Sequence, residues 1–214
     1  RYNRAQKRYG RHQRMKFILL DLGNVVIGVD FRRVFTSWAN SAQVSEKRFY
    51  ERWVLDSAYK QHEVGAIDFA EYTNHLGKKF DITLSLEAWQ KGWNDLWTSP
   101  FLSVIELLPQ LRARHRLFAF SNTNDTHANC WRSLFAQELA PFEEIYVSSE
   151  IGRRKPSPDA YLDVCQRMGA LPEEVLFIDD TMENIDGALA AGIDAHHSKT
   201  EADVANLLRP LLSS

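Results

Sequence analysis

Four polar clusters in this 214-residue chain each follow a short apolar run, and their residue types suit one another chemically. Asp21 offers a carboxylate, Ser121 a hydroxyl, Lys155 an ammonium, and residues 179–180 a pair of carboxylates. Such groups could hold a phosphate, a divalent cation and a nucleophile in one crevice. Gly23 stands two residues after Asp21, where a second acid would help. The clusters therefore predict phosphate chemistry with one element absent.

Asp21 is the candidate nucleophile. An ionised carboxylate can attack phosphorus to give an aspartyl-phosphate, which divides the transfer into two steps. Because the attack brings one anion against another, cations are needed beside it. Asp179 and Asp180 could hold Mg²⁺, which prefers oxygen ligands, and the Lys155 ammonium could neutralise the nucleophile and the phosphoryl group. Each residue alone is typical of a helix cap or a charged surface, but their combination favours catalysis.

The turn after residue 120 is the candidate phosphate site. Ser121 could donate its hydroxyl to a phosphoryl oxygen. The backbone N–H groups of Asn122 and Thr123 could add further hydrogen bonds, as at other anion-binding turns.

Alternating strands and helices must position these residues. Continuous apolar runs, typical of central strands buried on both faces, predict strands at residues 17–20, 117–120, 145–147 and 175–178. Helical patterns cover residues 103–114, 157–168, 183–191 and 201–212. This alternation predicts an α/β fold with a doubly wound parallel sheet, whose ligands bind at the carboxyl ends of the strands.

Residues 31–100 interrupt the alternation and predict an α-helical insertion. They hold five of the six tryptophans and no clear buried strand. Trp89, Trp93 and Trp97 recur every four residues, so we expect them on one helical face in the core rather than stacked on a substrate. The predicted core then comprises residues 15–30 and 101–214.

The length and composition suit one globular α/β domain, and the overall charge does not indicate binding to nucleic acid or to an anionic membrane. The net charge of −2 gives no reason to expect nucleic acid or an anionic membrane, and no obligate protein partner is evident. Residues 1–14 carry six basic residues and no acid, which indicates an upstream extension or a vector-derived segment. No apolar run approaches the roughly 18 residues needed to cross a bilayer. Cys130 and Cys165 are expected to be reduced, mostly buried thiols of a cytoplasmic protein.

Four motifs at these positions resemble those of the haloacid dehalogenase-like hydrolase superfamily. They read DLGNVV (21–26), SNTND (121–125), RRKPSPDAY (153–161) and FIDDTMENIDGA (177–188). The resemblance is to subfamily IA, which has a helical cap inserted after the first motif. More narrowly, it is to the bacterial branch that includes α-D-glucose-1-phosphate phosphatase. It implies a Rossmann-like core, a Mg²⁺ cofactor and a small phosphorylated metabolite as substrate, such as glucose 1-phosphate.

The resemblance also implies roles for individual residues. Asp21 is the nucleophile, and Lys155 stabilises the phosphoryl group. The metal site comprises Asp21, Gly23 through its carbonyl, Asp180 and the assisting Asp179. Asn184 orients the acidic loop. The remaining substrate-binding residues are Ser121, Asn122, Gly23, Asn24 and, from the cap, His62.

The glycine at position 23 departs from the family pattern, in which an Asp there serves as general acid and base. Losing such a group typically costs about 10²–10⁴-fold in rate. A less basic leaving group, such as an anomeric hydroxyl, would relax the requirement, and several other side chains could replace the acid: Asp30, Asn24, His127, His62 and Glu63. The rival readings are a 2-haloacid dehalogenase and a catalytically weak regulatory or binding protein on the same scaffold.

Overall fold

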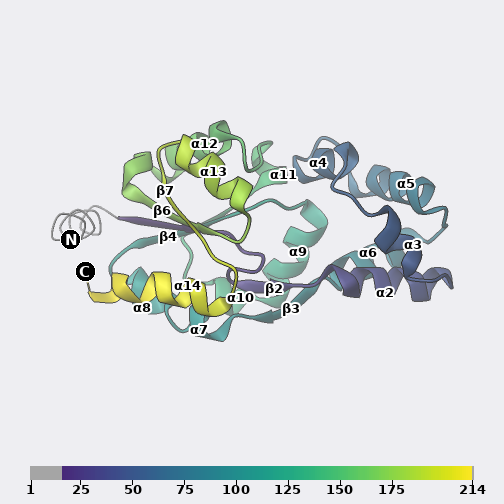
Figure 1. The fold of residues 1–214 in the computed structure, drawn as a ribbon, viewed down its shortest axis with the longest axis horizontal. Helices are drawn as coiled ribbons and strands as arrows, with labels where there is room; N and C mark the ends of the chain where they lie inside the picture. Colours follow the sequence, from purple (N-terminus) through teal and green to yellow (C-terminus); the bar gives the residue numbers. More distant parts are fainter. Residues whose placement is uncertain (1–15, 214) are drawn as a thin grey trace.

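A five-stranded parallel sheet forms the centre of the computed structural model, which describes residues 16–213 (Figure 1). Its strand order is β5-β4-β1-β6-β7, with parallel pairing throughout. The strands are β1 (Phe17–Leu20), β4 (Arg116–Ser121), β5 (Glu144–Val147), β6 (Val175–Asp179) and β7 (Asp194–His197). The predicted α/β fold with a parallel sheet is confirmed, whereas the basic segment 1–14 lies outside the described residues.

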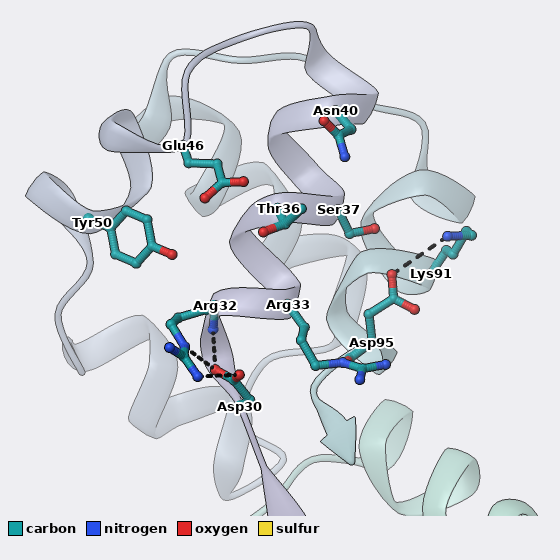
Figure 2. Close-up of a pocket in the computed structure, with 10 residues that line it drawn as sticks. All are labelled: Asp30, Arg32, Arg33, Thr36, Ser37, Asn40, Glu46, Tyr50, Lys91 and Asp95. Carbon is teal, nitrogen blue, oxygen red and sulfur yellow. Dashed lines mark hydrogen bonds and ion pairs between the residues drawn. The ribbon is translucent and has the colours of Figure 1, made fainter.

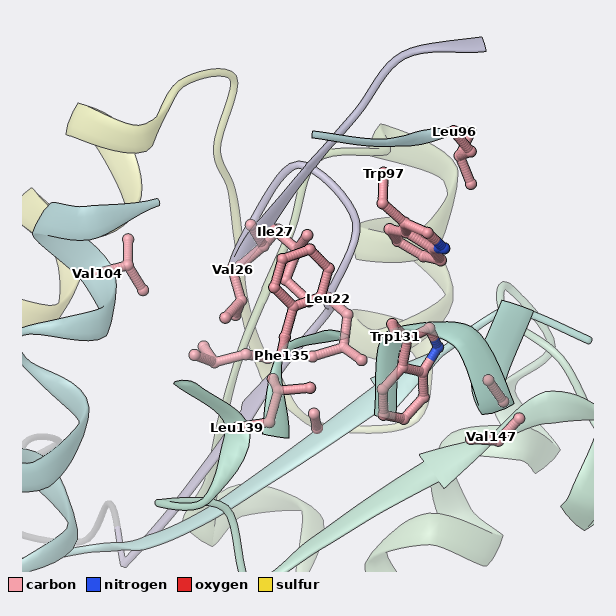
Figure 3. Packing of buried hydrophobic residues seen from close by; sticks show 14 of the residues in the cluster. Leu22, Val26, Ile27, Leu96, Trp97, Val104, Trp131, Phe135, Leu139 and Val147 are labelled. Carbon is pink, nitrogen blue, oxygen red and sulfur yellow. The ribbon is translucent and has the colours of Figure 1, made fainter. Parts of the chain in front are cut away.

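Helices cover both faces of this sheet. Those of the core are α7 (Leu102–Ile105), α8 (Leu108–Arg112), α9 (Asp125–Leu134), α10 (Ala136–Leu139), α11 (Ser148–Ile151), α12 (Pro158–Met168), α13 (Met182–Ala190) and α14 (Glu201–Leu208). Helices α7, α8 and α14 lie below the sheet in Figure 1, and α12 and α13 lie above it. In β1, Ile18 and Leu20 join one buried cluster and Leu19 joins the other, so both faces are apolar. Figure 3 shows part of the larger cluster, including Trp131 and Leu22.

Two predicted helices are shorter than expected because of proline. Residues 103–114 form α7 and α8 instead of one helix, since Pro109 lacks an N–H and stands in the first turn of α8. Helix α14 ends at Leu208 and a 3-10 turn, η2 (Arg209–Ser213), follows with Pro210 in it. A further short turn, η1 (Pro172–Glu174), precedes β6. Strand β7 was not predicted, because its sequence DAHH is polar and lies at the sheet edge.

The inserted residues form a group of helices at one end of the sheet, to the right in Figure 1. These helices are α2 (Phe31–Ala42), α3 (Lys47–Arg52), α4 (Ser57–Glu63), α5 (Phe69–Phe80) and α6 (Leu86–Asn94). A two-stranded antiparallel ribbon, β2 (Ile27–Val29) and β3 (Trp97–Pro100), joins them to the core. We call helices α2–α6 the cap.

The tryptophans of the cap are packed in its interior. Trp93 stacks on Trp38 with 5.6 Å between ring centroids, and Trp89 is also buried. The prediction that Trp97 shares their helical face is wrong. Helix α6 has ended before Trp97, which belongs to β3 and pairs with Val29. The four-residue spacing of the tryptophans thus extends beyond the end of α6, so it does not indicate a helix at Trp97.

Two smaller predictions concern membranes and thiols. Within residues 16–213, no helix has the length and apolar character that crossing a membrane requires. Cys130 and Cys165 are free thiols, the first half-buried and the second buried, as expected.

Candidate active site

The predicted residues meet because three neighbouring strands end at the same edge of the sheet. Asp21 follows β1, Ser121 ends β4 and Asp179 ends β6. Strand β1 lies between the other two, so its carboxylate is flanked by both. The Asp21 backbone N–H donates to the carbonyl of Ile178 at 2.9 Å, which continues the sheet pairing to the site itself.

Lys155 is the centre of the cluster and is only 1% exposed. Its Nζ lies 2.6 Å from Oδ1 of Asp21, 2.7 Å from Oδ2 of Asp179 and 2.8 Å from the carbonyl oxygen of Phe120. An ammonium has three N–H donors, so all three have an acceptor. Attraction to these two carboxylates raises the pKa of Lys155 against the opposing effect of burial, which keeps it charged.

The side chain of Asn122 holds the backbone of Lys155 by two hydrogen bonds. Its Oδ1 accepts from the Lys155 backbone N–H at 2.8 Å, and its Nδ2 donates to the Lys155 carbonyl at 2.9 Å. Asn122 was predicted to hold phosphate, but its amide side chain is engaged in this clamp. The expected anion contact from the Thr123 amide is wrong, because that N–H donates to Oγ of Ser148 at 2.8 Å.

Three carboxylates lie together beside this single lysine. Each of Asp21, Asp179 and Asp180 offers an oxygen within 4.8 Å of the others. Burial raises the pKa of Asp21 to about 7, with Lys155 opposing the rise and the two neighbouring carboxylates adding to it. Three carboxylates beside one ammonium leave an excess of negative charge, and all the donors are oxygens. This donor set fits a divalent cation such as Mg²⁺.

Two asparagines and a histidine hold the acidic loop in place. Asn184 Nδ2 donates to both oxygens of Asp179, at 3.0 and 3.1 Å, as its predicted orienting role requires. Asn24 Nδ2 donates to Oδ2 of Asp180 at 3.2 Å. The ring of His197 lies 2.9 Å from the Asp180 carbonyl oxygen through Nε2. The loop is thus held from α13, from the turn after β1 and from β7.

A cavity of about 500 Å³ opens over Asp21 between the core and the cap. The predicted residues that line it are Asp21, Gly23, Asn24, Ser121, Asn122, Lys155, Asp180 and Asn184. His62 is not brought to it: it is 4% exposed and stacks on Tyr72 inside the cap, 4.5 Å between centroids. Burial lowers the pKa of His62 to about 4, so it is neutral there.

Two of the suggested replacements for an acid at position 23 are unsuited. Asp30 caps α2 and pairs with Arg32 in a separate cavity of about 640 Å³ on the cap (Figure 2), where this pairing lowers its pKa. His127 does line the site, but burial lowers its pKa to about 3. Its Nε2 lies 2.9 Å from the carbonyl oxygen of Trp93, which places the single ring proton on that nitrogen.

Glu63 is the remaining acid among the suggested replacements; it lines the cavity and belongs to an ion pair that sequence reasoning missed. Arg154 Nε donates to Glu63 Oε2 at 2.8 Å, joining the cap to the core. Burial raises the pKa of Glu63, opposed by Arg154 and by a hydrogen bond from Tyr59. The sequence contained one signal that Arg154 would line the cavity: it directly precedes Lys155, and both residues border the same cavity in the structure.

The fold and this cluster define an α/β protein with a buried ammonium and three carboxylates at the carboxyl ends of its central strands. Comparison with known proteins gives the family: residues 15–192 match the haloacid dehalogenase-like hydrolases, and the chain belongs to that family.

Its relatives include phosphatases. D-ribitol-5-phosphate phosphatase from Bacteroides thetaiotaomicron is 22% identical over 206 residues, covering 94% of this chain and all of that protein. A haloacid dehalogenase family enzyme from the same organism, solved with magnesium and inorganic phosphate, is 29% identical with a TM-score of 0.77, covering 91% of this chain and all of that one. A predicted hydrolase of Porphyromonas gingivalis has a TM-score of 0.81 at 21% identity, covering 94% and 98%, and supports the fold alone.

Proposed function

We propose that this protein is a Mg²⁺-dependent phosphatase that acts on a sugar or polyol phosphate through an aspartyl-phosphate. One observation carries the proposal: the Lys155 ammonium contacts Asp21 at 2.6 Å and Asp179 at 2.7 Å, with the Asp180 carboxylate in the same cluster. A nucleophilic carboxylate held beside a cation and a cation-binding pair suits attack on an anionic phosphorus centre. The relatives named as phosphatases support the same reading.

Each residue then has a task in the reaction. Asp21 attacks phosphorus through a carboxylate oxygen as the P–O bond to the leaving group breaks, and the leaving oxygen departs as an alcohol with a proton from solvent. Water then hydrolyses the aspartyl-phosphate, which releases inorganic phosphate and restores Asp21. Lys155 favours the ionised form of that carboxylate and draws the phosphoryl group toward it. Ser121 donates a hydrogen bond to a phosphoryl oxygen. When bound, Mg²⁺ would be held by Asp21, Asp180 and the Gly23 carbonyl, with Asp179 beside them, and would supply positive charge that offsets the phosphoryl oxygens.

The substrate assignment stays at the level of class. Glucose 1-phosphate, predicted from the sequence, is one candidate, and ribitol 5-phosphate, from the name of a relative, is another. Both leave a hydroxyl-rich product, which suits a cavity lined by aromatic rings together with polar groups. The cytoplasmic location stays a prediction.

One assay tests the proposal against its rivals. Purified protein is offered sugar phosphates with Mg²⁺ or EDTA and, separately, 2-chloropropionate, with Asp21→Asn as the inactive control. Mg²⁺-dependent phosphate release that Asp21→Asn abolishes is expected. Chloride release without metal would establish a dehalogenase instead, and retained Mg²⁺ binding without turnover of any substrate would establish a regulatory protein.

A further inference from the structure

The Glu63–Arg154 ion pair forms part of the wall of the active-site cavity. Glu63 ends helix α4 of the cap, and its side chain is 5% exposed, whereas that of Arg154 is 23% exposed. Both residues line the cavity that opens over Asp21. The phosphoryl group belongs at Asp21, so the leaving group of the substrate occupies the part of the cavity that the cap covers.

Both ends of the pair are held before any substrate binds. The Glu63 carbonyl accepts from the Ser148 hydroxyl at 2.6 Å, and Tyr59 stands one helical turn before Glu63 in α4. Arg154 precedes Lys155, whose backbone is clamped by Asn122. The pair therefore has a fixed position relative to the Lys155 ammonium. Ligand binding then requires little loss of conformational entropy in these two side chains.

The chemistry of the pair favours one kind of leaving group. A guanidinium has five N–H donors and a carboxylate about four acceptor sites, so one ion pair leaves capacity of both kinds with no net charge. A sugar hydroxyl both donates and accepts, and it can use the two partners together. At the pair itself, a carboxylate or second phosphate would face the Glu63 charge, because Arg154 is already neutralised; Lys60, which also lines the cavity, is a cation outside the pair. The apolar faces of Val29, Phe31 and Trp97 in the same cavity suit the C–H faces of a sugar.

Resting on the proposed phosphatase function, we propose that Glu63 and Arg154 are the specificity-determining pair that selects a neutral, hydroxyl-bearing leaving group and rejects an anionic one. The pair binds the leaving group by hydrogen bonds and takes no part in the transfer of the phosphoryl group.

Two substrates of equal length test this selection: D-ribitol 5-phosphate and D-ribonate 5-phosphate, which differ by a terminal hydroxymethyl or carboxylate group. With Mg²⁺, the wild type should have the higher kcat/KM for the ribitol ester. Glu63→Gln frees the guanidinium, so kcat/KM for the ribitol ester should fall about tenfold to hundredfold and preference should move toward ribonate by more than tenfold. Arg154→Gln leaves the carboxylate unbalanced, so preference should move the opposite way.

The opposite shifts separate selection from mere attachment of the cap. If the pair only attached the cap to the core, both variants would have a lower kcat/KM for both substrates, by the same factor. That result would overturn the proposal. So would a wild type that prefers ribonate. Glu150→Gln is the matched control, because it breaks an exposed pair with Arg132 at 2.6 Å outside the cavity and should leave both values unchanged.

Stability and basal activity are measured alongside. Melting temperatures show whether each variant is folded, and Arg154→Gln, at the more exposed end of the pair, still tests the prediction where Glu63→Gln does not fold. A wild type that cleaves p-nitrophenyl phosphate but neither ribose-derived ester would overturn the selection and leave the phosphatase function standing. A wild type that cleaves no phosphomonoester would refute the phosphatase function itself.

Discussion

Gly23→Asp should raise the turnover of substrates with alcohol leaving groups, because it restores an acid two residues after the nucleophile. A positioned general acid contributes about 10²–10⁴-fold, or about 3–5 kcal/mol of barrier. The backbone accepts the change, since Gly23 is not among the residues with positive φ. A Cβ there would lie 3.3 Å from Cγ2 of Val29, a side-chain contact that a small shift relieves.

The expected gain is smaller than the full contribution of an acid. The new Cβ would lie 3.9 Å from Oδ2 of Asp21, so the two carboxyl groups would be neighbours. Their repulsion favours a protonated acid at position 23, which helps the leaving group. It also disfavours ionisation of Asp21, whose pKa burial already raises to about 7. We therefore expect a net gain in kcat of about tenfold to hundredfold, which lies below the usual range and reaches only its lower limit.

A pair of substrates makes the prediction specific to proton transfer. Ribitol 5-phosphate releases an alkoxide that needs a proton, whereas p-nitrophenyl phosphate releases a stable phenolate. The gain should appear in kcat for the first and be nearly absent for the second. Gly23→Asn has the same size without an acidic proton and should give no gain. Equal gains on both substrates, or a gain with Gly23→Asn, would refute the reasoning.

Three other changes test the packing, the charge cluster and the buried histidine. Gly65→Ala should lower Tm and raise KM more than it lowers kcat. Gly65 has a φ of +70°, and a Cβ there would lie 2.7 Å from the Ser149 carbonyl oxygen, so the substitution disturbs the contact between the cap and the core. An unchanged KM would show that this contact does not affect substrate binding. Asp21→Asn should abolish phosphate release yet raise Tm in EDTA, since it removes one of three clustered carboxylates while Lys155 keeps another partner; a lower Tm in EDTA would contradict the electrostatics. The pKa of His62 is about 4 in the folded protein against 6.5 ordinarily, so the unfolded chain binds the proton first. Between these values the free energy of unfolding should fall, as pH falls, by up to about 1.4 kcal/mol per unit. Urea titrations at several pH values in this range give the free energy of unfolding as a function of pH. This free energy should change less steeply with pH in His62→Phe than in the wild type. An identical pH dependence would exclude His62 as its source.

The sequence was sufficient to predict which polar residues meet at the candidate site, because each of these residues is marked locally. Continuous apolar runs identify strands buried on both faces, and a polar residue at the end of such a run has only one edge of the sheet to occupy. Asp21, Ser121 and Asp179 follow this rule, and they meet in the structure as expected.

The contact between the cap and the core was beyond prediction. The Glu63–Arg154 pair joins residues from two different parts of the fold, and nothing in either local sequence specifies that they touch. His62 and Glu63 are adjacent in sequence, yet one faces the cap interior and the other the cavity. Which of two neighbours faces the ligand depends on how α4 is rotated against its surroundings. That rotation is decided by tertiary packing, and periodicity in so short a helix does not resolve it.

The central position of β1 has a consequence for how the chain is made. Phe17 pairs with Arg116 on one side and with Val175 on the other, so β1 has both of its neighbours only after β4 and then β6 have left the ribosome. The helices α2–α6 contact one another locally and can pack much earlier. A nascent chain that stops before β6 therefore carries a structured cap above an apolar strand with one open edge. Such an intermediate exposes an unpaired strand edge and apolar surface, which favour aggregation.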